Sequence, residues 1–267
     1  MHTILFALLI AIASAAALVL LAAAFFIIYA HMLMKKRPLM SFYNERSAQA
    51  DYCPYDQLPD KMKEYIVIVE DEHFFEHKGY RKEAIKNAFR HNRKVRRIVI
   101  GGSTITQQLV KNIYFHFRKS YFRKIIELII AVKAERILGK EKILELYLNM
   151  IYYGNGKYGI CDAARFYFDK DVRKLSINQM FILACVVSAP TAGNPVQHPE
   201  VFERLRNRWL DLVLDGRHVV PEEDAAVIRQ YTAVRLDPEL HENDETTRDF
   251  PQTIPLINER FGPEAAG

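Results

Sequence analysis

An uninterrupted apolar stretch near the N-terminus constrains this chain more than any other feature. From Ile4 to Ala30, about 27 residues, the sequence contains no charged side chain. This length exceeds the ~20 residues that a helix needs to cross the hydrocarbon core of a bilayer. The apolar region of a cleaved signal peptide, which is the alternative, is only ~7–15 residues long. We therefore predict that residues 1–37 form an uncleaved N-terminal transmembrane anchor and its flanking residues.

The charges beside this stretch bear on which side of the membrane the rest of the chain lies. Lys35, Lys36 and Arg37 follow the stretch, and no Lys or Arg precedes it. Because positive charge accumulates on the cytoplasmic side of membrane segments, this pattern would leave the C-terminal body in the cytoplasm. The motifs described below favour the opposite face. The charge rule is statistical, so we give the motifs more weight.

The remaining ~230 residues suit one domain, or one domain with a small lobe. The chain has 50% hydrophobic and 26% charged residues, which is typical of a globular body. Its net charge of +5 fits anionic phosphates, an anionic membrane surface or nucleic acid, and does not choose among them. The three cysteines are an odd number without metal-ligand spacing, so they predict no disulfide framework. Cys161 and Cys185 have apolar neighbours, and we expect buried free thiols.

The body is expected to be mainly α-helical, since no segment has convincing strand alternation. We divide it into a linker at 38–57, a main domain at 58–215, and a C-terminal helix with a loosely ordered tail at 216–267. The linker should be irregular and extended, residues 93–102 should form a mobile loop, and residues 151–159 should form a glycine-rich loop. The predicted helices are 60–71, 81–92, one from Thr104, 120–138 ending at Gly139, 140–149, one after Ser176, 199–214 and 221–232.

The first string with chemical potential is EDEHFFEHKG, residues 70–79. Glu70 lies near the C-terminus of a predicted helix, where the partial charge is negative, and Asp71 and Glu72 add like charge. Both effects raise the pKa of a carboxyl group, as a general base requires. Asp71 is the alternative base. From this string alone, a solvated acidic helix end is the favoured interpretation.

The second string is GGSTITQQLVKN, residues 101–112. Two glycines before a hydroxyl-rich helix start can form an anion site from free backbone N–H groups and side-chain donors. Gln107, Gln108 and Lys111 are spaced to line one face of the helix that follows. Thr104 and Gln107 also form a possible capping box. Ordinary capping with surface polar residues is the alternative.

Two further strings follow. Residues 117–127, FRKSYFRKIIE, give a dense positive patch in which Arg123 and Glu127 are four residues apart. A solvated helix face with a surface ion pair, worth only ~0.3 kcal/mol, is the alternative interpretation. Residues 140–170 contain apolar helical positions and a glycine-rich turn, and we interpret this stretch mostly as scaffold.

Together the four strings resemble glycosyltransferase family 51, the peptidoglycan glycosyltransferases. The family pattern E-D-x-x-F-x-x-H-x-G matches residues 70–79, and G-x-S-T-x-T-Q-Q matches residues 101–108. R-K-x-x-E matches residues 123–127, and K-x-x-I-L-x-x-Y-L-N matches residues 140–149. The resemblance covers about residues 58–215, and four ordered motifs at family-like spacing are very specific.

The resemblance implies a lysozyme-like α-helical glycosyltransferase domain with a small membrane-proximal jaw lobe, carried by one N-terminal transmembrane helix. It implies polymerisation of lipid II onto a lipid-linked growing glycan strand. Glu70 would deprotonate the acceptor hydroxyl, and Glu127 would organise the diphosphate of the leaving group. The implied substrate-binding residues are Ser103, Thr104, Gln107, Gln108, Lys111, Arg118, Lys119, Arg123 and Lys124.

The chain departs from the family pattern at two positions. Ile126 stands where members often have Lys, and Lys119 stands where the family places an arginine, with Arg118 beside it. One phosphate contact is therefore expected to be rearranged. No transpeptidase domain could fit after residue 215, so we expect a monofunctional enzyme.

The resemblance leaves room for a divalent cation, Mg²⁺ or Mn²⁺, without naming its ligands, and implies no organic cofactor. It implies a single-pass protein of the cytoplasmic membrane with its catalytic domain extracytoplasmic. Transpeptidases and division or elongation proteins are the expected protein partners. Two other functions are open: a lysozyme-like enzyme that cleaves glycan strands, and a non-catalytic membrane-anchored scaffold. Nucleic acid is not an expected partner, since no recognised nucleic-acid fold or aromatic stacking motif is present.

Overall fold

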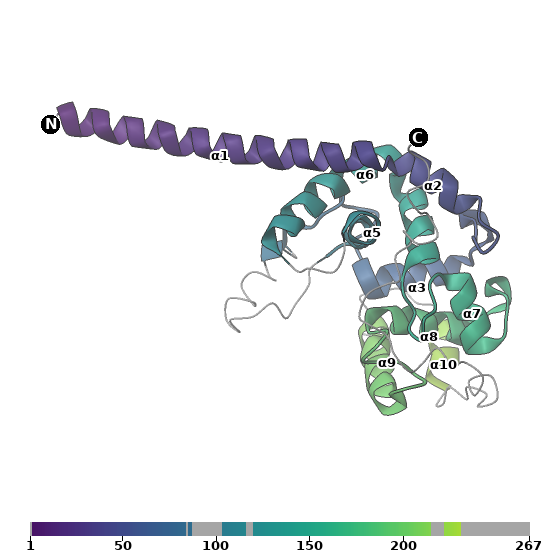
Figure 1. Ribbon diagram of the computed structural model, residues 1–267. Helices are drawn as coiled ribbons and strands as arrows, with labels where there is room; N and C mark the ends of the chain where they lie inside the picture. The colour runs from purple at the N-terminus through teal and green to yellow at the C-terminus, as the bar shows by residue number, and fades with distance from the viewer. Residues whose placement is uncertain (1, 84, 87–102, 116–119, 215–221, 231–267) are drawn as a thin grey trace.

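The computed structural model describes residues 2–83, 85–86, 103–115, 120–214 and 222–230 (Figure 1). Within these residues every regular element is a helix, and extended pairing is limited to an isolated bridge between Tyr152 and Tyr158. The prediction of a mainly α body is therefore confirmed. The predicted loop at 93–102, most of the predicted helix at 81–92 and the tail from 237 lie outside the described residues.

The N-terminal apolar stretch forms one long helix, α1 (His2–Lys36), which extends away from the other helices in Figure 1. Within the described residues it is the helix that is long and apolar enough to cross a membrane. Ala30, near its C-terminal end, is its buried residue. At that end α1 packs against α6 (Tyr121–Met150) through the ring of Phe122, which lies 5.2 Å from the ring of Phe26.

The segment expected to be an irregular linker is instead largely folded onto the domain. It contains helix α2 (Leu39–Ser47), which packs against α6, and the short 3₁₀ helix η1 (Tyr55–Gln57). Leu39 and Phe42, one helical turn apart, are almost fully buried. The prediction was wrong because the segment has only a short apolar face, and the helix depends on tertiary packing of that face rather than on local signals.

Three helices that carry the candidate motifs begin and end close to the predicted positions. They are α3 (Asp60–Asp71), α5 (Ile105–Tyr114) and α6. The capping box of Thr104 and Gln107 at the start of α5 is confirmed. The backbone of Gly139 is non-helical, with φ of 75°, and the two halves of α6 meet there at an angle in Figure 1. The predicted stop at Gly139 and the separate helix after it are therefore confirmed.

The C-terminal half of the domain surrounds an apolar helix, α8 (Ile177–Ser188), which packs against α3, α7 (Ile160–Phe168), α9 (Pro199–Leu214) and α10 (Glu222–Gln230). The 3₁₀ helix η2 (Val172–Lys174) connects α7 to α8. The predicted capping box of Ser176 and Gln179 opens α8. Nearly all of α8 is buried, so it forms the centre of the core against which α3 is held.

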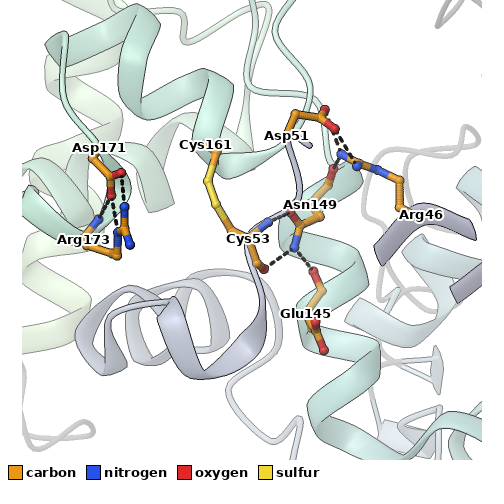
Figure 2. Close-up of a disulfide and its surroundings, with 8 residues drawn as sticks. All are labelled: Arg46, Asp51, Cys53, Glu145, Asn149, Cys161, Asp171 and Arg173. Atoms are coloured by element: carbon orange, nitrogen blue, oxygen red, sulfur yellow. Dashed lines mark hydrogen bonds and ion pairs between the residues drawn. A yellow bond between two sulfur atoms is a disulfide. The ribbon is translucent and has the colours of Figure 1, made fainter. Parts of the chain in front are cut away.

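The cysteines correct one prediction. Cys185 is a free thiol buried in α8, as expected. Cys161, however, is joined to Cys53 by a disulfide, with their Cα atoms 6.6 Å apart (Figure 2). The two residues are 108 positions apart in the sequence, and the contact depends on how α7 and the segment after α2 pack, which an odd cysteine count cannot reveal.

Candidate active site

Glu70 lies where three helices meet. It is the penultimate residue of α3, and its Oε2 atom accepts a hydrogen bond of 2.7 Å from Gln108 Nε2 on α5. The hydroxyl of Tyr147, on the second half of α6, donates to the same oxygen over 3.4 Å. The same hydroxyl lies 3.3 Å from Gln108 Oε1. A single carboxylate is therefore oriented by neutral donors from two other helices.

Burial raises the pKa of Glu70 above its usual range, and this is the largest influence on it. The hydrogen bonds from Gln108 and Tyr147 and the charge of Lys111 lower the pKa, while Asp71 raises it more weakly. The predicted direction is confirmed, but the leading cause is loss of water rather than neighbouring negative charge. A carboxylate that is partly shielded from water and has a raised pKa is suited to accept a proton.

Asp71, the alternative base, is committed to internal contacts. It is buried, and its Oδ2 atom accepts the backbone N–H of Ile105 over 3.0 Å at the start of α5. The same oxygen lies 2.8 Å from His77 Nε2. Because His77 Nδ1 accepts the N–H of Gly79, Nε2 is the nitrogen that carries the proton toward Asp71. Asp71 therefore fixes α5 relative to α3 and is poorly placed to accept a substrate proton.

Glycine is required at position 79 by both conformation and space. Its φ is +93°, and a Cβ atom there would lie 2.9 Å from the backbone of Ala131 in α6. Its carbonyl accepts a hydrogen bond of 2.8 Å from Thr104 Oγ1. The first and second motifs are thus joined directly, which places Glu70 beside α5.

The second carboxylate, Glu127, has a different environment. It lies in the first half of α6 with only 2% of its side chain exposed. Arg123 Nε lies 2.6 Å from one of its oxygens, and Lys124 Nζ lies 3.2 Å from the other. Lys124 also donates to Ser103 Oγ over 2.7 Å, so the start of α5 is tied to the same cluster. Because the carboxylate is buried, the alternative of a solvated surface ion pair does not hold.

Lys111 connects the two carboxylates electrostatically. Burial lowers the pKa of its ammonium group, and Glu127 opposes this more strongly than any other neighbour. Glu70 also raises the pKa of Lys111, whereas Arg123 and Lys124 lower it. The charge of Lys111 therefore acts on both carboxylates of the site. Such an arrangement favours binding of an anionic group between the two carboxylates.

The remaining predicted binding residues occupy three kinds of position. Thr104 and Gln107 are buried and make the capping box of α5, and Gln107 Oε1 also lies 3.4 Å from Lys124 Nζ. These two residues build the site from within, and their direct contact with a substrate stays a prediction. Ser103 is partly exposed beside Lys124. Arg118 and Lys119 lie outside the described residues.

Two tyrosines from the stretch interpreted as scaffold reach this site. Tyr147 is fully buried and contacts Glu70 directly, and its place in the Y-L-N pattern was the one signal that could have identified it. Tyr153 is also fully buried, and its pKa is raised by burial and, less strongly, by the charge of Glu70. Among the described residues no hydrogen-bond partner is found for its hydroxyl. No local sequence signal distinguishes Tyr153 from an ordinary core residue.

The described residues contain no group of three or more His, Cys, Asp or Glu side chains that could hold a metal ion alone. Glu127 is the carboxylate nearest to the cationic cluster, and both of its oxygens are engaged by Arg123 and Lys124. A divalent cation bound here would need further ligands from a substrate, and Mg²⁺ is commonly held by one or two carboxylates together with phosphates. Among the described residues, Glu127 could therefore hold a divalent cation only with the help of a phosphate-bearing ligand.

Comparison with known proteins matches residues 35–214 to the family described as Transglycosylase. The chain belongs to the transglycosylase family. It is 39% identical over 186 residues to penicillin-binding protein 1A of Aquifex aeolicus, an alignment that covers 70% of this chain and 26% of that protein. It is 33% identical over 208 residues to penicillin-binding protein 4 of Bacillus subtilis, covering 78% of this chain and 32% of that protein.

A third relative is the biosynthetic peptidoglycan transglycosylase of Paraburkholderia xenovorans, with 42% identity over 144 residues, or 54% of this chain and 60% of the relative. The chain thus spans about a quarter to a third of the two penicillin-binding proteins that it matches. The transglycosylase match includes Glu70, Lys111, Glu127 and Tyr147 together with the segment 38–57. The family resemblance predicted from the motifs is therefore confirmed, and its extent includes the segment expected to be a linker.

Proposed function

We propose that this chain is a peptidoglycan glycosyltransferase that polymerises lipid II into glycan strands. The observation that carries the proposal is the pairing of two carboxylates, Glu70 half-buried and Glu127 buried, with opposite surroundings. Glu70 is held by neutral donors, and Glu127 is held by cations, with Lys111 acting on both. A base beside a site for a phosphate-bearing leaving group is what transfer of a sugar from a lipid diphosphate requires.

In this mechanism Glu70 takes the proton from the GlcNAc 4-hydroxyl of lipid II. The oxygen attacks C1 of the MurNAc unit at the end of the growing strand, and the lipid diphosphate leaves. The anomeric centre inverts, which gives a β-1,4 linkage. Lys111, Arg123 and Lys124 stabilise the charge that grows on the diphosphate. Glu127 holds Arg123 and Lys124 in position, and a divalent cation, Mg²⁺ or Mn²⁺, would supply further charge to the diphosphate when bound.

The contacts between the membrane helix and the first half of α6 support the proposal that the substrate is bound at a membrane. Phe122 contacts the rings of Phe25, Phe26 and Tyr29 on α1, with centroid distances of 5.2–6.2 Å. Tyr121 and Ile125 are exposed beside it, with 74% and 42% of their surface accessible. Exposed apolar groups next to a membrane helix are suited to contact lipid. This half of α6 corresponds to the expected membrane-proximal jaw lobe.

The body is proposed to be extracytoplasmic, on the outer face of the cytoplasmic membrane. The Cys53–Cys161 disulfide supports this side, because disulfides persist in oxidising compartments and are rare in the cytosol. The basic residues after α1 favour the cytoplasm. A reporter fused after residue 215 distinguishes the two: an export-dependent reporter should be active there, and activity of a cytoplasm-dependent reporter would contradict this placement. Transpeptidases and division or elongation proteins are proposed partners.

The proposed activity is tested by incubating the detergent-purified protein with labelled lipid II. Polymer is expected from the natural chain, and Glu70→Gln should form it at least about 100-fold more slowly. Disaccharide fragments released from preformed glycan strands would instead indicate a glycan-cleaving enzyme. If neither polymer nor fragments form while lipid II still binds, a non-catalytic role is indicated.

A further inference from the structure

Along the sequence, the two disulfide-bonded cysteines lie on either side of the residues of the candidate active site. Cys53 lies between α2 and η1, and Cys161 is the second residue of α7. The two cysteines are 108 positions apart, and the segment between them contains α3, α5 and α6. Glu70, Lys111 and Glu127 lie on these helices. A covalent bond between the ends of such a loop restricts the unfolded chain more than a bond across a short loop.

Cys53 is held in place for this bond by contacts that do not involve its sulfur. Its backbone N–H donates to Asn149 Oδ1 and its carbonyl accepts from Asn149 Nδ2, both over 2.8 Å (Figure 2). Asn149 Nδ2 also donates to the carbonyl of Glu145 over 2.9 Å. Arg46 donates to the carbonyl of Asn149, and its two terminal guanidinium nitrogens pair with the two carboxylate oxygens of Asp51. The position of the Cys53 backbone is therefore fixed by contacts that are independent of the disulfide.

Of the two bonded cysteines, Cys161 can be reached from outside. Both line a pocket of about 170 Å³, together with Asp51, Arg165 and Arg173. Cys53 is buried, whereas Cys161 is partly exposed. Cys161 also lies in the first turn of α7, where the helix N-terminus stabilises a thiolate. Cys185, in contrast, is fully buried in α8 and cannot meet an external reagent in the folded protein.

We propose that Cys53 and Cys161 form an oxidative modification site, completed after folding by a disulfide-bearing oxidant, that locks the segment 38–57 onto the catalytic domain. The thiolate of Cys161 attacks one sulfur of the oxidant's disulfide, and the other sulfur leaves as a thiolate. Cys53 then attacks the Cys161 sulfur of this mixed disulfide and releases the oxidant as a dithiol. The chain loses two electrons and two protons, which the oxidant gains.

Oxidation of the two cysteines in the cell rests on the extracytoplasmic placement proposed above, whereas closure of the bond in the purified reduced chain does not, and the test keeps the two apart. Cells carrying the full chain are dissolved in denaturant that contains a small thiol-blocking reagent, so that every free thiol, including that of Cys185, is blocked, and the purified protein is then reduced and labelled with a maleimide of large mass. Two newly reactive thiols per chain are expected for the natural protein and for Cys185→Ala. None is expected for the double variant C53S/C161S. In parallel, the reporter after residue 215 gives the side of the membrane.

If the reporter is exported and reduction exposes no new thiols, the modification site is wrong while the topology stands. If the reporter is cytoplasmic, the proposed topology is wrong. Oxidation of the purified reduced chain then tests whether the Cys53–Cys161 bond forms. Incubation with glutathione disulfide should then form the Cys53–Cys161 bond and leave Cys185 free, and failure to do so would overturn the proposal.

Thermal unfolding of the full chain in detergent measures what the bond does. C53S/C161S is expected to melt about 10 °C below the natural protein, because the enclosed loop is long. Dithiothreitol should lower the melting temperature of the natural protein and of Cys185→Ala, and should leave that of C53S/C161S unchanged. Equal melting temperatures for the oxidised natural protein and C53S/C161S would show that the bond does not lock the segment.

Discussion

Glu70 and Glu127 are both glutamates on helices, the first half-buried and the second buried, yet their surroundings give them opposite chemistry. Glu70 accepts hydrogen bonds from an amide and a phenol, and burial raises its pKa. Glu127 is paired with Arg123 and Lys124, whose charges compensate its own. Burial with neutral donors produces a group that can take up a proton. Burial with cations produces a fixed ionic cluster that positions positive charge.

The largest expected effect is the loss of the base. Glu70→Gln keeps the shape of the side chain and should lower the rate of lipid II polymerisation by about 10²–10⁴-fold, the usual contribution of general base catalysis. Glu64→Gln, a partly exposed residue of the same helix, serves as the control and should keep full activity. If Glu70→Gln keeps more than about a tenth of the rate, Glu70 is not the base.

The same variant should not lose stability. Because the pKa of Glu70 is raised in the folded protein, stability is fully present below the pKa of the unfolded state and declines as pH rises through the folded-state pKa. Glu70→Gln removes this titration, so its melting temperature should equal or exceed that of the natural protein at neutral pH. The difference should shrink as the pH is lowered. A lower melting temperature at neutral pH would mean that Glu70 is chiefly a structural residue.

The second effect tests the link between the two regions. Lys111→Ala should weaken lipid II binding by about 10–100-fold, because charge-assisted hydrogen bonds contribute ~1.5–3 kcal/mol. Turnover should fall as well, since Lys111 acts on both Glu70 and Glu127. Lys174→Ala, which removes an exposed lysine of η2, provides the comparison. Unchanged affinity and turnover in Lys111→Ala would remove it from the site.

A smaller effect concerns the donors that orient Glu70. Their hydrogen bonds favour the carboxylate, so removing one raises the pKa of Glu70 and moves the acidic limb of the pH–rate profile to higher pH. Gln108→Met should move it more than Tyr147→Phe, because the two contacts are 2.7 Å and 3.4 Å long. The profiles are measured from initial polymerisation rates. An acidic limb that stays in place in both variants would mean that it does not report Glu70.

The smallest expected effect is that of Tyr153. Its buried hydroxyl lies in the field of Glu70 and has no partner among the described residues, so we expect it to contact a water or substrate group near the base. Tyr153→Phe should lower turnover by about 2–5-fold, the equivalent of a hydrogen bond worth ~0.5–1 kcal/mol. Tyr65→Phe removes another buried hydroxyl without a partner in the described part, on α3, and should not change turnover. Equal effects of the two variants would contradict a role at the site.

The features that could be predicted from the sequence are those with local causes. The capping box at Thr104, the break at Gly139 and the ends of α3 depend on residues a few positions apart. The fold followed from the motifs and the family that they resemble, and the same motifs singled out both glutamates, whose roles stay predictions. Their surroundings did not, because Glu70 meets Tyr147 across 77 positions of sequence.

The incorrect predictions have the same origin. The helix α2 forms because Leu39 and Phe42 are buried against the domain, and the disulfide forms because α7 approaches Cys53. Both depend on packing between segments that are distant in sequence. The pKa of Glu70 was predicted in the right direction from neighbouring charges, but burial, which is a property of the assembled fold, is the stronger cause.

The most direct test of the difference between the two glutamates is the affinity for lipid II of Glu70→Gln and Glu127→Gln, measured side by side on folded protein. Glu70→Gln should bind lipid II as tightly as the natural protein, because it loses only its basicity. Glu127→Gln should bind about 10-fold more weakly or worse, because Arg123 and Lys124 lose the charge that positions them. Equal loss of affinity in both variants, or a greater loss in Glu70→Gln, would contradict the division of the site into a base and a diphosphate-binding cluster.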